Sequence, residues 1–458
     1  MVASNLPTAK DQLTLFQNKE ASPVEIANLA LAALDENSDL NFIRVPDRDE
    51  ILKQARRSEE RWFKRDPLGL LDGVLSTAKD NCLVRDWTSN WGSTLRSKMG
   101  EEDSPAVARL REAGSIILGI TTMPELGWKG VCDNALTGST LNPWNRSRTS
   151  GGSSGGAAVT AALGIAPLNI GTDGAGSIRI PASFCGVVGF KPTFGVVPAF
   201  PVGALPQFTH IGPITRTVAD AILMFEVVAQ PDNRDWQALP FKLPPSPRRQ
   251  HLKVAYSRTL GYAKPDEDVI RVVDEAISRL RGQGWEIDEI DPGFDEPIEI
   301  LRPLYYAAFA NMVAGMGPFA KEIVDAGLIE EINALGSVNG DQIIAALSRR
   351  DGLGRHMNIF HESYDLLITP TMPSVALEAG LIVPEGSGMK SWLEWNPYTY
   401  PFNLTQQPAA SIPCGLSRGL PVGMQVVGRR HRDAFVLEAC ELIERDIAAL
   451  RSDARLPR

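Results

Sequence analysis

Ser150-Gly-Gly-Ser-Ser-Gly-Gly-Ala-Ala-Val159 and, after an apolar run, Gly171-Thr-Asp-Gly-Ala-Gly-Ser-Ile-Arg-Ile-Pro181 form the stretch around which this sequence is organised. It holds eight glycines within 26 residues, in a chain with 40 glycines among 458 residues. Because glycine is costly to order in regular structure, such a cluster indicates backbone that approaches another group or exposes N–H donors. Three serines lie in or beside the clusters: Ser153, Ser154 and Ser177. Hydroxyls among bare donors indicate a nucleophile beside an oxyanion hole, with a pair of flexible loops as the alternative.

Three local motifs compete to explain this stretch. Residues 151–155 fit the nucleophile elbow G-x-S-x-G, which needs a preceding strand, but residues 142–149 read as a poor strand. Ser76-Thr-Ala-Lys79 fits the S-x-x-K motif of serine–lysine acylases, but the accompanying S-D-N and K-T-G elements are missing. A phosphate-binding loop is the weakest interpretation, because neither of its glycine patterns occurs.

A fourth interpretation accounts for all of these residues together. The sequence resembles the amidase signature family in Lys79-Asp80-Asn81, in both glycine clusters and in the 24-residue spacing of Ser153 and Ser177. Further segments of the family pattern are Leu141–Trp144, Gly189–Thr193, Gly212–Asp220 and Gly419–Gln425. The resemblance runs from about residue 20 to about residue 445.

The resemblance implies an α/β fold for residues 1–458: a single large domain in which a mixed, twisted sheet of about eleven strands is covered by helices on both sides. Strands that alternate with helices along the chain favour the same class. We expect surface excursions at 230–252, which is rich in proline and charge, and at 373–400, which carries Trp392, Trp395, Tyr398 and Tyr400.

The resemblance also implies a Ser–Ser–Lys triad that cleaves carboxamides without a metal or cofactor. By motif, Ser177 is the nucleophile, Ser153 is the bridging serine on a cis peptide bond, and Lys79 is the base. The implied oxyanion hole consists of four backbone N–H groups, those of Gly174, Ala175, Gly176 and Ser177. The implied acyl pocket contains Gly127 and Trp128.

One residue departs from the family pattern, which commonly has Thr-Gly-Gly-Ser where this chain has Gly174-Ala-Gly-Ser177. A left-handed φ at Ala175 would cost about 1 kcal/mol and would reshape the oxyanion hole slightly.

Elementary chemistry sets two further expectations for the charged neighbours. Lysine removes a proton only when neutral, so burial or cationic neighbours must lower the pKa of Lys79 from its ordinary value of about 10.4. Asp80 must therefore point away from Lys79, since a nearby carboxylate would keep the amine charged. We expect Asp173 and Arg179 to brace the nucleophile loop.

The remaining composition is that of an ordinary soluble protein. A net charge of −9 argues against nucleic acid or an acidic membrane as a partner, and no apolar run is long enough for a membrane span. Five scattered cysteines predict reduced, buried thiols, and five histidines form no ligand pattern, so we expect no metal. A cytoplasmic location and a homodimer are further expectations.

These observations predict an amidase that acts on a small or aromatic carboxamide through an acyl-enzyme. A glutamine-hydrolysing component of a tRNA-dependent amidotransferase is the first alternative, because it would use the same triad. A non-catalytic binding protein on the same fold is an alternative of a different class.

Overall fold

A computed structural model describes residues 6–240 and 252–451. Its main sheet contains β1 (Ile43–Arg44), β2 (Leu75–Lys79), β5 (Ile116–Thr121), β10 (Leu168–Asp173), β11 (Val188–Lys191), β12 (His210–Thr215), β13 (Lys253–Tyr256), β14 (Glu286–Glu289), β15 (Leu366–Pro370), β16 (Ala409–Ser417) and β17 (Leu420–Gly428). Small two-stranded ribbons pair β3 (Thr88–Ser89) with β4 (Lys98–Met99), β6 (Asp133–Asn134) with β7 (Gly138–Ser139), and β8 (Leu141–Asn142) with β9 (Asn145–Thr149).

The helices in the described residues are α1 (Ala9–Asn18), α2 (Pro23–Glu36), α3 (Arg48–Lys64), α4 (Pro105–Glu112), α5 (Gly155–Ala162), α6 (Arg179–Cys185), α7 (Val218–Val228), α8 (Glu267–Gly282), α9 (Ile298–Ala314), α10 (Ala320–Ile323), α11 (Ala326–Leu335), α12 (Gly340–Ser363), α13 (Pro401–Leu404), α14 (Asp433–Asp446) and α15 (Ala448–Arg451). Short 3₁₀ turns are η1 (Ser38–Leu40), η2 (Glu125–Gly127) and η3 (Trp392–Trp395).

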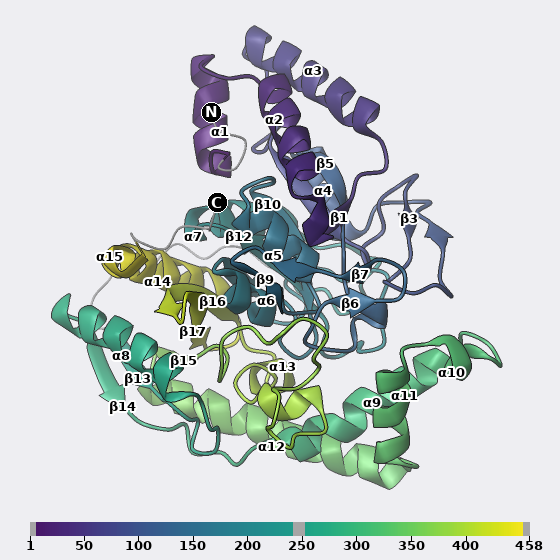
Figure 1. The fold of residues 1–458 in the computed structure, drawn as a ribbon. Helices are drawn as coiled ribbons and strands as arrows, with labels where there is room; N and C mark the ends of the chain where they lie inside the picture. Colours follow the sequence, from purple (N-terminus) through teal and green to yellow (C-terminus); the bar gives the residue numbers. More distant parts are fainter. Residues whose placement is uncertain (1–5, 241–251, 452–458) are drawn as a thin grey trace.

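The main sheet has eleven strands in the order β1-β5-β2-β10-β12-β11-β16-β17-β15-β13-β14 (Figure 1). Strands β5, β2 and β10 run parallel to one another, as do β15, β13 and β14, whereas the strands between β10 and β15 pair antiparallel. The expected mixed sheet of about eleven strands is therefore confirmed.

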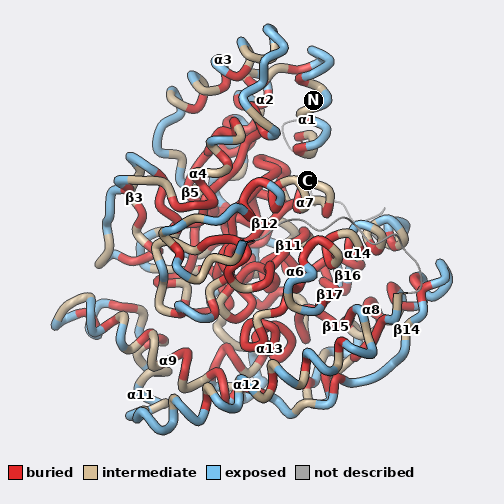
Figure 2. Tube along the Cα trace, turned by 180° about the vertical axis from the view of Figure 1, so that it is seen from behind, coloured by how far each residue is buried: buried red, intermediate tan, exposed pale blue. Residues whose placement is uncertain are grey.

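Helices cover both faces of this sheet. Helices α5 and α6 contact each other; α5 packs on β2, β5, β10 and β12, and α6 packs on β11, β16 and β17. Helix α7 contacts β10, β11 and β12 without meeting α5 or α6 closely. Helices α4 and α14 pack against α7, and α14 also contacts α8, so these four helices share the opposite face. The tube in Figure 2 shows the consequence: buried backbone in the central strands and exposed backbone on the outer helices.

Local sequence signals explain where the first helices begin. In α2, the Ser22 hydroxyl accepts from the Glu25 N–H at 3.2 Å while the Glu25 carboxylate accepts from the Ser22 N–H at 2.9 Å. A capping box with proline at the first helical position is a sequence pattern that predicts a helix start, and α2 begins at this pattern. Ser104-Pro105 likewise predicts a cap before α4, but the Ser104 hydroxyl does not cap the helix and accepts from the N–H of Leu83 at 2.7 Å.

The two predicted surface excursions have different outcomes. Residues 241–251 of the first lie outside the described residues. The second, 373–400, is no excursion at its aromatic end, where four rings are almost completely buried: Trp392, Trp395, Tyr398 and Tyr400. Burial removes a large apolar area from water, which is why this segment packs inward.

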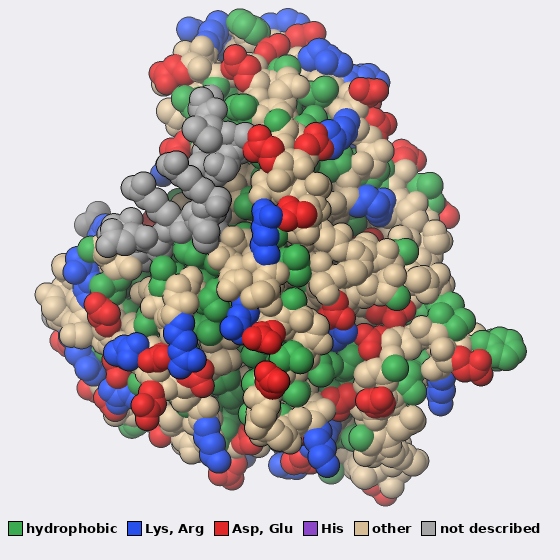
Figure 3. Space-filling model, viewed as in Figure 1, with side chains coloured by type: hydrophobic (Ala, Val, Ile, Leu, Met, Phe, Trp, Pro, Cys, Tyr) green, Lys and Arg blue, Asp and Glu red, His purple; other side chains and the backbone are tan. Residues whose placement is uncertain are grey.

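The surface carries no dominant sign of charge on the face shown in Figure 3, where acidic and basic side chains are interspersed. Among the described residues, no helix combines the length and the apolar character that crossing a membrane requires.

Candidate active site

Parallel strands β2 and β10 bring the predicted site residues to one edge of the sheet. Leu168 pairs with Ser76 and Asn169 with Thr77, so Lys79 at the end of β2 lies beside the end of β10. The carboxyl ends of parallel strands are where α/β sheets usually place their ligands. The glycine loop before α5 folds over this edge and contributes Ser153 and Ser154.

Lys79 is fully buried among hydroxyl groups. Its Nζ lies 2.7 Å from Ser153 Oγ, 2.9 Å from Ser154 Oγ and 2.9 Å from Thr172 Oγ1. Burial disfavours the charged form and lowers the pKa of Lys79 to about 7, although the more distant Asp173 carboxylate opposes this shift. Lys79 is therefore a lysine that is substantially neutral near pH 7.

Asp80, its neighbour in the chain, faces away from this amine as expected. Its carboxylate accepts from the N–H groups of Asn90 at 3.1 Å and Gly92 at 2.9 Å, and Arg44 lies 3.8 Å from it. This arrangement keeps a second negative charge off Lys79.

The two predicted serines meet at one pocket. The Gly152–Ser153 peptide bond is cis, as the family resemblance implies. Ser153 and Ser177 both line the pocket, and the Ser154 N–H donates to the carbonyl of Ser177 at 3.1 Å, which ties the two glycine loops together. The structure thus brings Lys79, Ser153 and Ser177 to the same place.

A buried ion pair braces the loop that carries Ser177. The Arg179 guanidinium donates to both oxygens of the Asp173 carboxylate at 3.0 Å, and both side chains are completely buried. Arg179 also donates to three acceptors from the C-terminal part of the chain: Thr399 O, Gln425 Oε1 and Asn403 Oδ1. The predicted bracing role of Asp173 and Arg179 is confirmed by these contacts.

The predicted oxyanion hole needs one correction. The Gly176 N–H donates to Asp173 Oδ1 at 2.7 Å, so this donor already serves the ion pair. The carbonyl of the same peptide unit, that of Ala175, accepts from Asn396 Nδ2 at 2.6 Å and Thr399 Oγ1 at 2.7 Å. Both the N–H and the carbonyl of the Ala175–Gly176 peptide are therefore engaged. The remaining candidate donors to an oxyanion are the N–H groups of Gly174, Ala175 and Ser177.

The alanine at position 175 does not cause the expected backbone strain. The residue with a left-handed φ is Gly176, at 126°, and Ala175 is not among the residues with positive φ. A Cβ at Gly176 would lie 2.2 Å from Thr399 Oγ1, so glycine is required there. Ala175 therefore replaces the glycine of the family pattern at a position where the backbone does not require glycine.

The pocket above the two serines is narrow and uncharged, with a volume of about 40 Å³. None of the described residues that line it is acidic or basic; they are Asn81, Trp91, Leu126, Gly127, Ser153, Thr172, Gly174, Ser177, Gly203, Ala204, Leu205, Thr209, Tyr305 and Phe309. Gly127 lies in the pocket as predicted. Trp128 does not line it, because its completely buried indole packs behind the pocket with the ring carbons close to Gly327.

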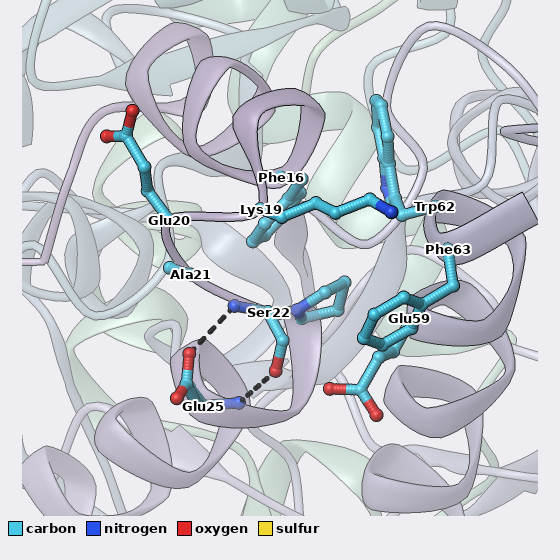
Figure 4. A pocket seen from close by; sticks show the side chains of 10 residues that line it. Phe16, Lys19, Glu20, Ala21, Ser22, Glu25, Glu59, Trp62 and Phe63 are labelled. Carbon is cyan, nitrogen blue, oxygen red and sulfur yellow. Dashed lines mark hydrogen bonds between the residues drawn. The ribbon is translucent and has the colours of Figure 1, made fainter. Parts of the chain in front are cut away.

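A larger cavity, of about 270 Å³, lies between the N-terminal helices (Figure 4). Phe16, Trp62 and Phe63 line it together with charged side chains. Its serine, Ser22, is engaged in the capping box of α2, as the dashed lines in Figure 4 mark. The larger cavity therefore contains no candidate nucleophile, and the smaller one is the candidate active site.

Sequence reasoning noted Ser154 among the serines of the glycine clusters but assigned neither Ser154 nor Thr172 a contact with Lys79. The Ser154 hydroxyl donates to the Thr172 carbonyl at 3.1 Å, and Thr172 Oγ1 accepts from Asn81 Nδ2 at 3.0 Å. Both side chains thereby present oxygen to Lys79. The sequence signals for these contacts are that Ser154 adjoins Ser153 and that Thr172 directly precedes Asp173.

The remaining expectations concern the competing motifs and the ligand types. Residues 145–149 do form a strand, contrary to prediction, but it pairs with β8 in a ribbon outside the main sheet. All five cysteines are buried and none of them forms a disulfide bond, as predicted. Across residues 6–240 and 252–451, no three histidine, cysteine or carboxylate side chains gather as a metal site would require.

We expect Gly127→Ala to lower kcat/KM. Gly127 has a φ of 74°, and a Cβ there would lie 3.0 Å from Met123 Cε and 3.3 Å from Ser153 Oγ. The added methyl group would strain the turn and press on Ser153, so we expect a loss of about 10- to 100-fold in steady-state assays. Gly138→Ala is the matched control, with a φ of 78° and only Asn41 near its Cβ position. An equal loss in both variants would contradict a specific role for Gly127.

Comparison with known proteins places this geometry in context. The family model described as Amidase matches residues 25–437. An acylamidase of Rhodococcus erythropolis is 33% identical over 456 residues, which cover 95% of this chain and 94% of that protein. A glutamyl-tRNA(Gln) amidotransferase component of Moorella thermoacetica is 32% identical, covering 95% and 96%. The crystal structure of a bacterial aryl acylamidase superimposes with a TM-score of 0.88 at 27% identity and covers 97% of this chain and 96% of that one.

Proposed function

Because this chain belongs to the amidase signature family and is an amidase, we propose that it hydrolyses carboxamides through a covalent acyl-serine intermediate. In this proposal Ser177 is the nucleophile, Ser153 relays protons, and Lys79 is the base. The N–H groups of Gly174, Ala175 and Ser177 stabilise the oxyanion.

The observation that carries the proposal is the 2.7 Å contact between Lys79 Nζ and Ser153 Oγ. A neutral amine has two N–H groups and one lone pair. The Ser154 hydroxyl donates its own hydrogen to the Thr172 carbonyl, so it accepts from Lys79. With the second N–H directed to Thr172 Oγ1, the lone pair remains for the hydroxyl hydrogen of Ser153.

The proposed acylation moves one proton along this line. Ser177 Oγ forms a bond to the carbonyl carbon and passes its proton to Ser153, whose own proton passes to Lys79. The carbonyl oxygen becomes an oxyanion in contact with the backbone N–H groups. The C–N bond then breaks as the proton returns through Ser153 to the departing amine. Water repeats the sequence on the acyl-enzyme, releases the acid and restores Ser177.

The lining of the pocket favours a neutral, apolar acyl group. Trp91, Leu126, Leu205, Tyr305 and Phe309 supply apolar surface, and no charged side chain of the described residues lines the pocket. A glutamine substrate would bring an ammonium and a carboxylate, and burying either without a partner is costly. We therefore propose small or aromatic carboxamides as substrates, in line with the acylamidase relatives.

The second candidate is glutamine hydrolysis as one component of a tRNA-dependent amidotransferase. Its support is the 32% identity to the Moorella thermoacetica amidotransferase component over nearly the whole chain. We rank it second because the pocket offers no charged partner to the α-amino and α-carboxylate groups of glutamine. We also propose a cytoplasmic enzyme that needs no metal, cofactor or nucleic acid and assembles as a homodimer.

A substrate panel tests this proposal. The purified chain, dialysed against EDTA, is assayed with acetyl, benzoyl and naphthoyl p-nitroanilides and, separately, with L-glutamine. We expect turnover of at least one anilide and glutamine turnover at least about 100-fold weaker, because a pocket without charges cannot pair the groups of glutamine. Glutamine hydrolysis alone would favour the second candidate. Activity that EDTA abolishes and zinc restores would contradict the metal-free mechanism.

A further inference from the structure

Helices α9, α10 and α11 form a cap over the candidate active site. We define the helical cap as residues 298–335; it projects from the sheet at the lower right of Figure 1, and α10 and α11 both pack on α9. Helix α9 reaches the pocket through Tyr305 and Phe309, which line it. The position of the cap therefore affects the shape of the pocket.

A second part of the pocket lining comes from the loop after β5. We call residues 124–131 the pocket loop; its Leu126 and Gly127 line the pocket, and Gly127 lies directly against Ser153. Both residues have a left-handed backbone, with φ of 55° and 74°. A turn of this kind holds its shape only when its surroundings fix it, because the conformation itself is unfavourable for leucine.

Three polar contacts join the pocket loop to the cap. Lys129 Nζ donates to Asp325 Oδ2 at 2.8 Å, and the Asp325 N–H donates to Glu125 Oε2 at 2.7 Å. The Tyr305 hydroxyl donates to the carbonyl of Trp128 at 2.8 Å. Asp325, the residue that precedes α11, thus accepts a hydrogen bond from the pocket loop and donates another to it.

The ion pair at the centre of these contacts is shielded from water. The side chain of Lys129 is 7% exposed and that of Asp325 is 19% exposed, and Asp133, on the same side as the loop, also accepts from Lys129 at 2.8 Å. Burial alone would lower the pKa of Lys129, but the two carboxylates outweigh burial and raise it. The lysine is therefore charged at neutral pH, and its ion pair with Asp325 is largely shielded from water.

The pocket is too small in this arrangement for a bulky acyl group. Its volume of about 40 Å³ is far below the roughly 300 Å³ or more of sites that enclose drug-sized ligands. A larger acyl group, such as an aromatic one, would need the pocket to widen, and the cap and the pocket loop form two of its walls. The contacts that resist this widening then select for small acyl groups.

We propose that Lys129 is a positioning and specificity-determining residue, which fixes the helical cap to the pocket loop through Asp325 and so limits the size of the acyl group that the enzyme accepts. The inference rests on the proposed acyl-enzyme function. It assigns no chemical step to Lys129, which acts through Leu126, Gly127 and the cap.

Four variants test the proposal, and two of them, Asp325→Asn and Asp133→Asn, replace one carboxylate oxygen with an amide nitrogen. Asp325→Asn removes the charge that crosses to the cap, while an amide oxygen can still accept from the Gly327 N–H, as Asp325 Oδ1 does at 2.9 Å. Asp133→Asn is the matched control, because it removes the other carboxylate of Lys129 without affecting a contact to the cap. Lys129→Met removes the cation, and Lys129→Arg keeps it.

The first readout is acyl selectivity. For the wild type we compare kcat/KM for acetyl and naphthoyl p-nitroanilide, which share a leaving group and differ in acyl size. In Asp325→Asn and Lys129→Met the ratio that favours acetyl should fall by about tenfold, whereas Asp133→Asn and Lys129→Arg should keep it. An unchanged ratio in both Asp325→Asn and Lys129→Met, when both variants are folded, would overturn the proposal. An equal fall of the ratio in Asp133→Asn would also overturn it.

The second readout does not depend on catalysis. Amide hydrogen exchange should become about tenfold faster in residues 298–335 of Asp325→Asn than in the same residues of Asp133→Asn, with the central sheet unchanged. Unchanged exchange in the cap would overturn the inference even if the wild type cleaves every anilide. Conversely, an inactive wild type with faster exchange in Asp325→Asn would refute the proposed function but retain the cap contact.

Discussion

Ser177→Ala is expected to abolish covalent labelling by a fluorophosphonate and to lower amide turnover by about 10⁴- to 10⁶-fold, the range expected when a catalytic nucleophile is removed. The physical reason is that the acyl-enzyme requires an oxygen at this position, at the pocket that Ser153 and Gly174 also line. Intact-mass measurement after labelling should give one adduct per wild-type chain and none in the variant.

Ser153→Ala provides the control for this result. It removes the proposed relay but keeps the oxygen of Ser177, so slow labelling should persist. If Ser177→Ala retained the adduct and Ser153→Ala lost it, the nucleophile would be Ser153 and the glycine stretch would act as a nucleophile elbow.

Lys79→Ala is expected to lower kcat/KM by about 10³- to 10⁴-fold, because general acid and base catalysis are both lost. The pH profile gives the more specific test. Burial lowers the pKa of Lys79 to about 7, and the neutral amine is the reactive form. In the wild type, kcat/KM should therefore rise with pH between about 6 and 8 and level off above the pKa.

The Lys79→Ala variant should lose this ascending limb. Lys79→Arg is a useful second variant, since a guanidinium stays protonated and should be as inactive as alanine. A wild-type rate that falls as pH increases through the neutral range would contradict a neutral lysine base.

The sequence predicted the elements that carry a simple periodic signal. The run 253–256 predicts a strand, which β13 forms with the same bounds, and the apolar, β-branched run 115–121 predicts a strand, which β5 forms from Ile116. Residues 432–450 predict a closing helix, which divides into α14 and α15 at Ile447. Short apolar runs and a helical repeat of apolar residues are local signals, which is why these segments could be predicted without tertiary information.

Strand β12 shows why other elements could not be predicted. Its residues His210-Ile-Gly-Pro-Ile-Thr215 contain glycine and proline, which usually indicate a turn rather than a strand inside a sheet. In the fold, a Cβ at Gly212 would lie 2.1 Å from the Phe190 carbonyl, so close strand packing selects glycine there. That constraint arises from a neighbour more than 20 residues away.

The candidate site divides in the same way. Motif spacing predicted that Lys79 and Ser153 belong together, and they lie within hydrogen-bond distance. Motif spacing could not predict that the Gly176 N–H donates to Asp173 or that the indole of Trp128 is completely buried. Nor could it predict that the Ala175 carbonyl accepts hydrogen bonds from Asn396 and Thr399. Those outcomes depend on side chains that meet only after folding.

The contacts of Arg179 have a consequence for the order in which the enzyme is made. Arg179 bonds to Asn403 and to Gln425, which lie 224 and 246 residues further along the chain. Strands β16 and β17 also fill the middle of the sheet, although they are the last strands to be synthesised. A nascent chain on the ribosome therefore carries Ser177 long before it holds the support of the loop around it. Hydrolytic activity would begin only after the ribosome has translated the chain beyond Gln425.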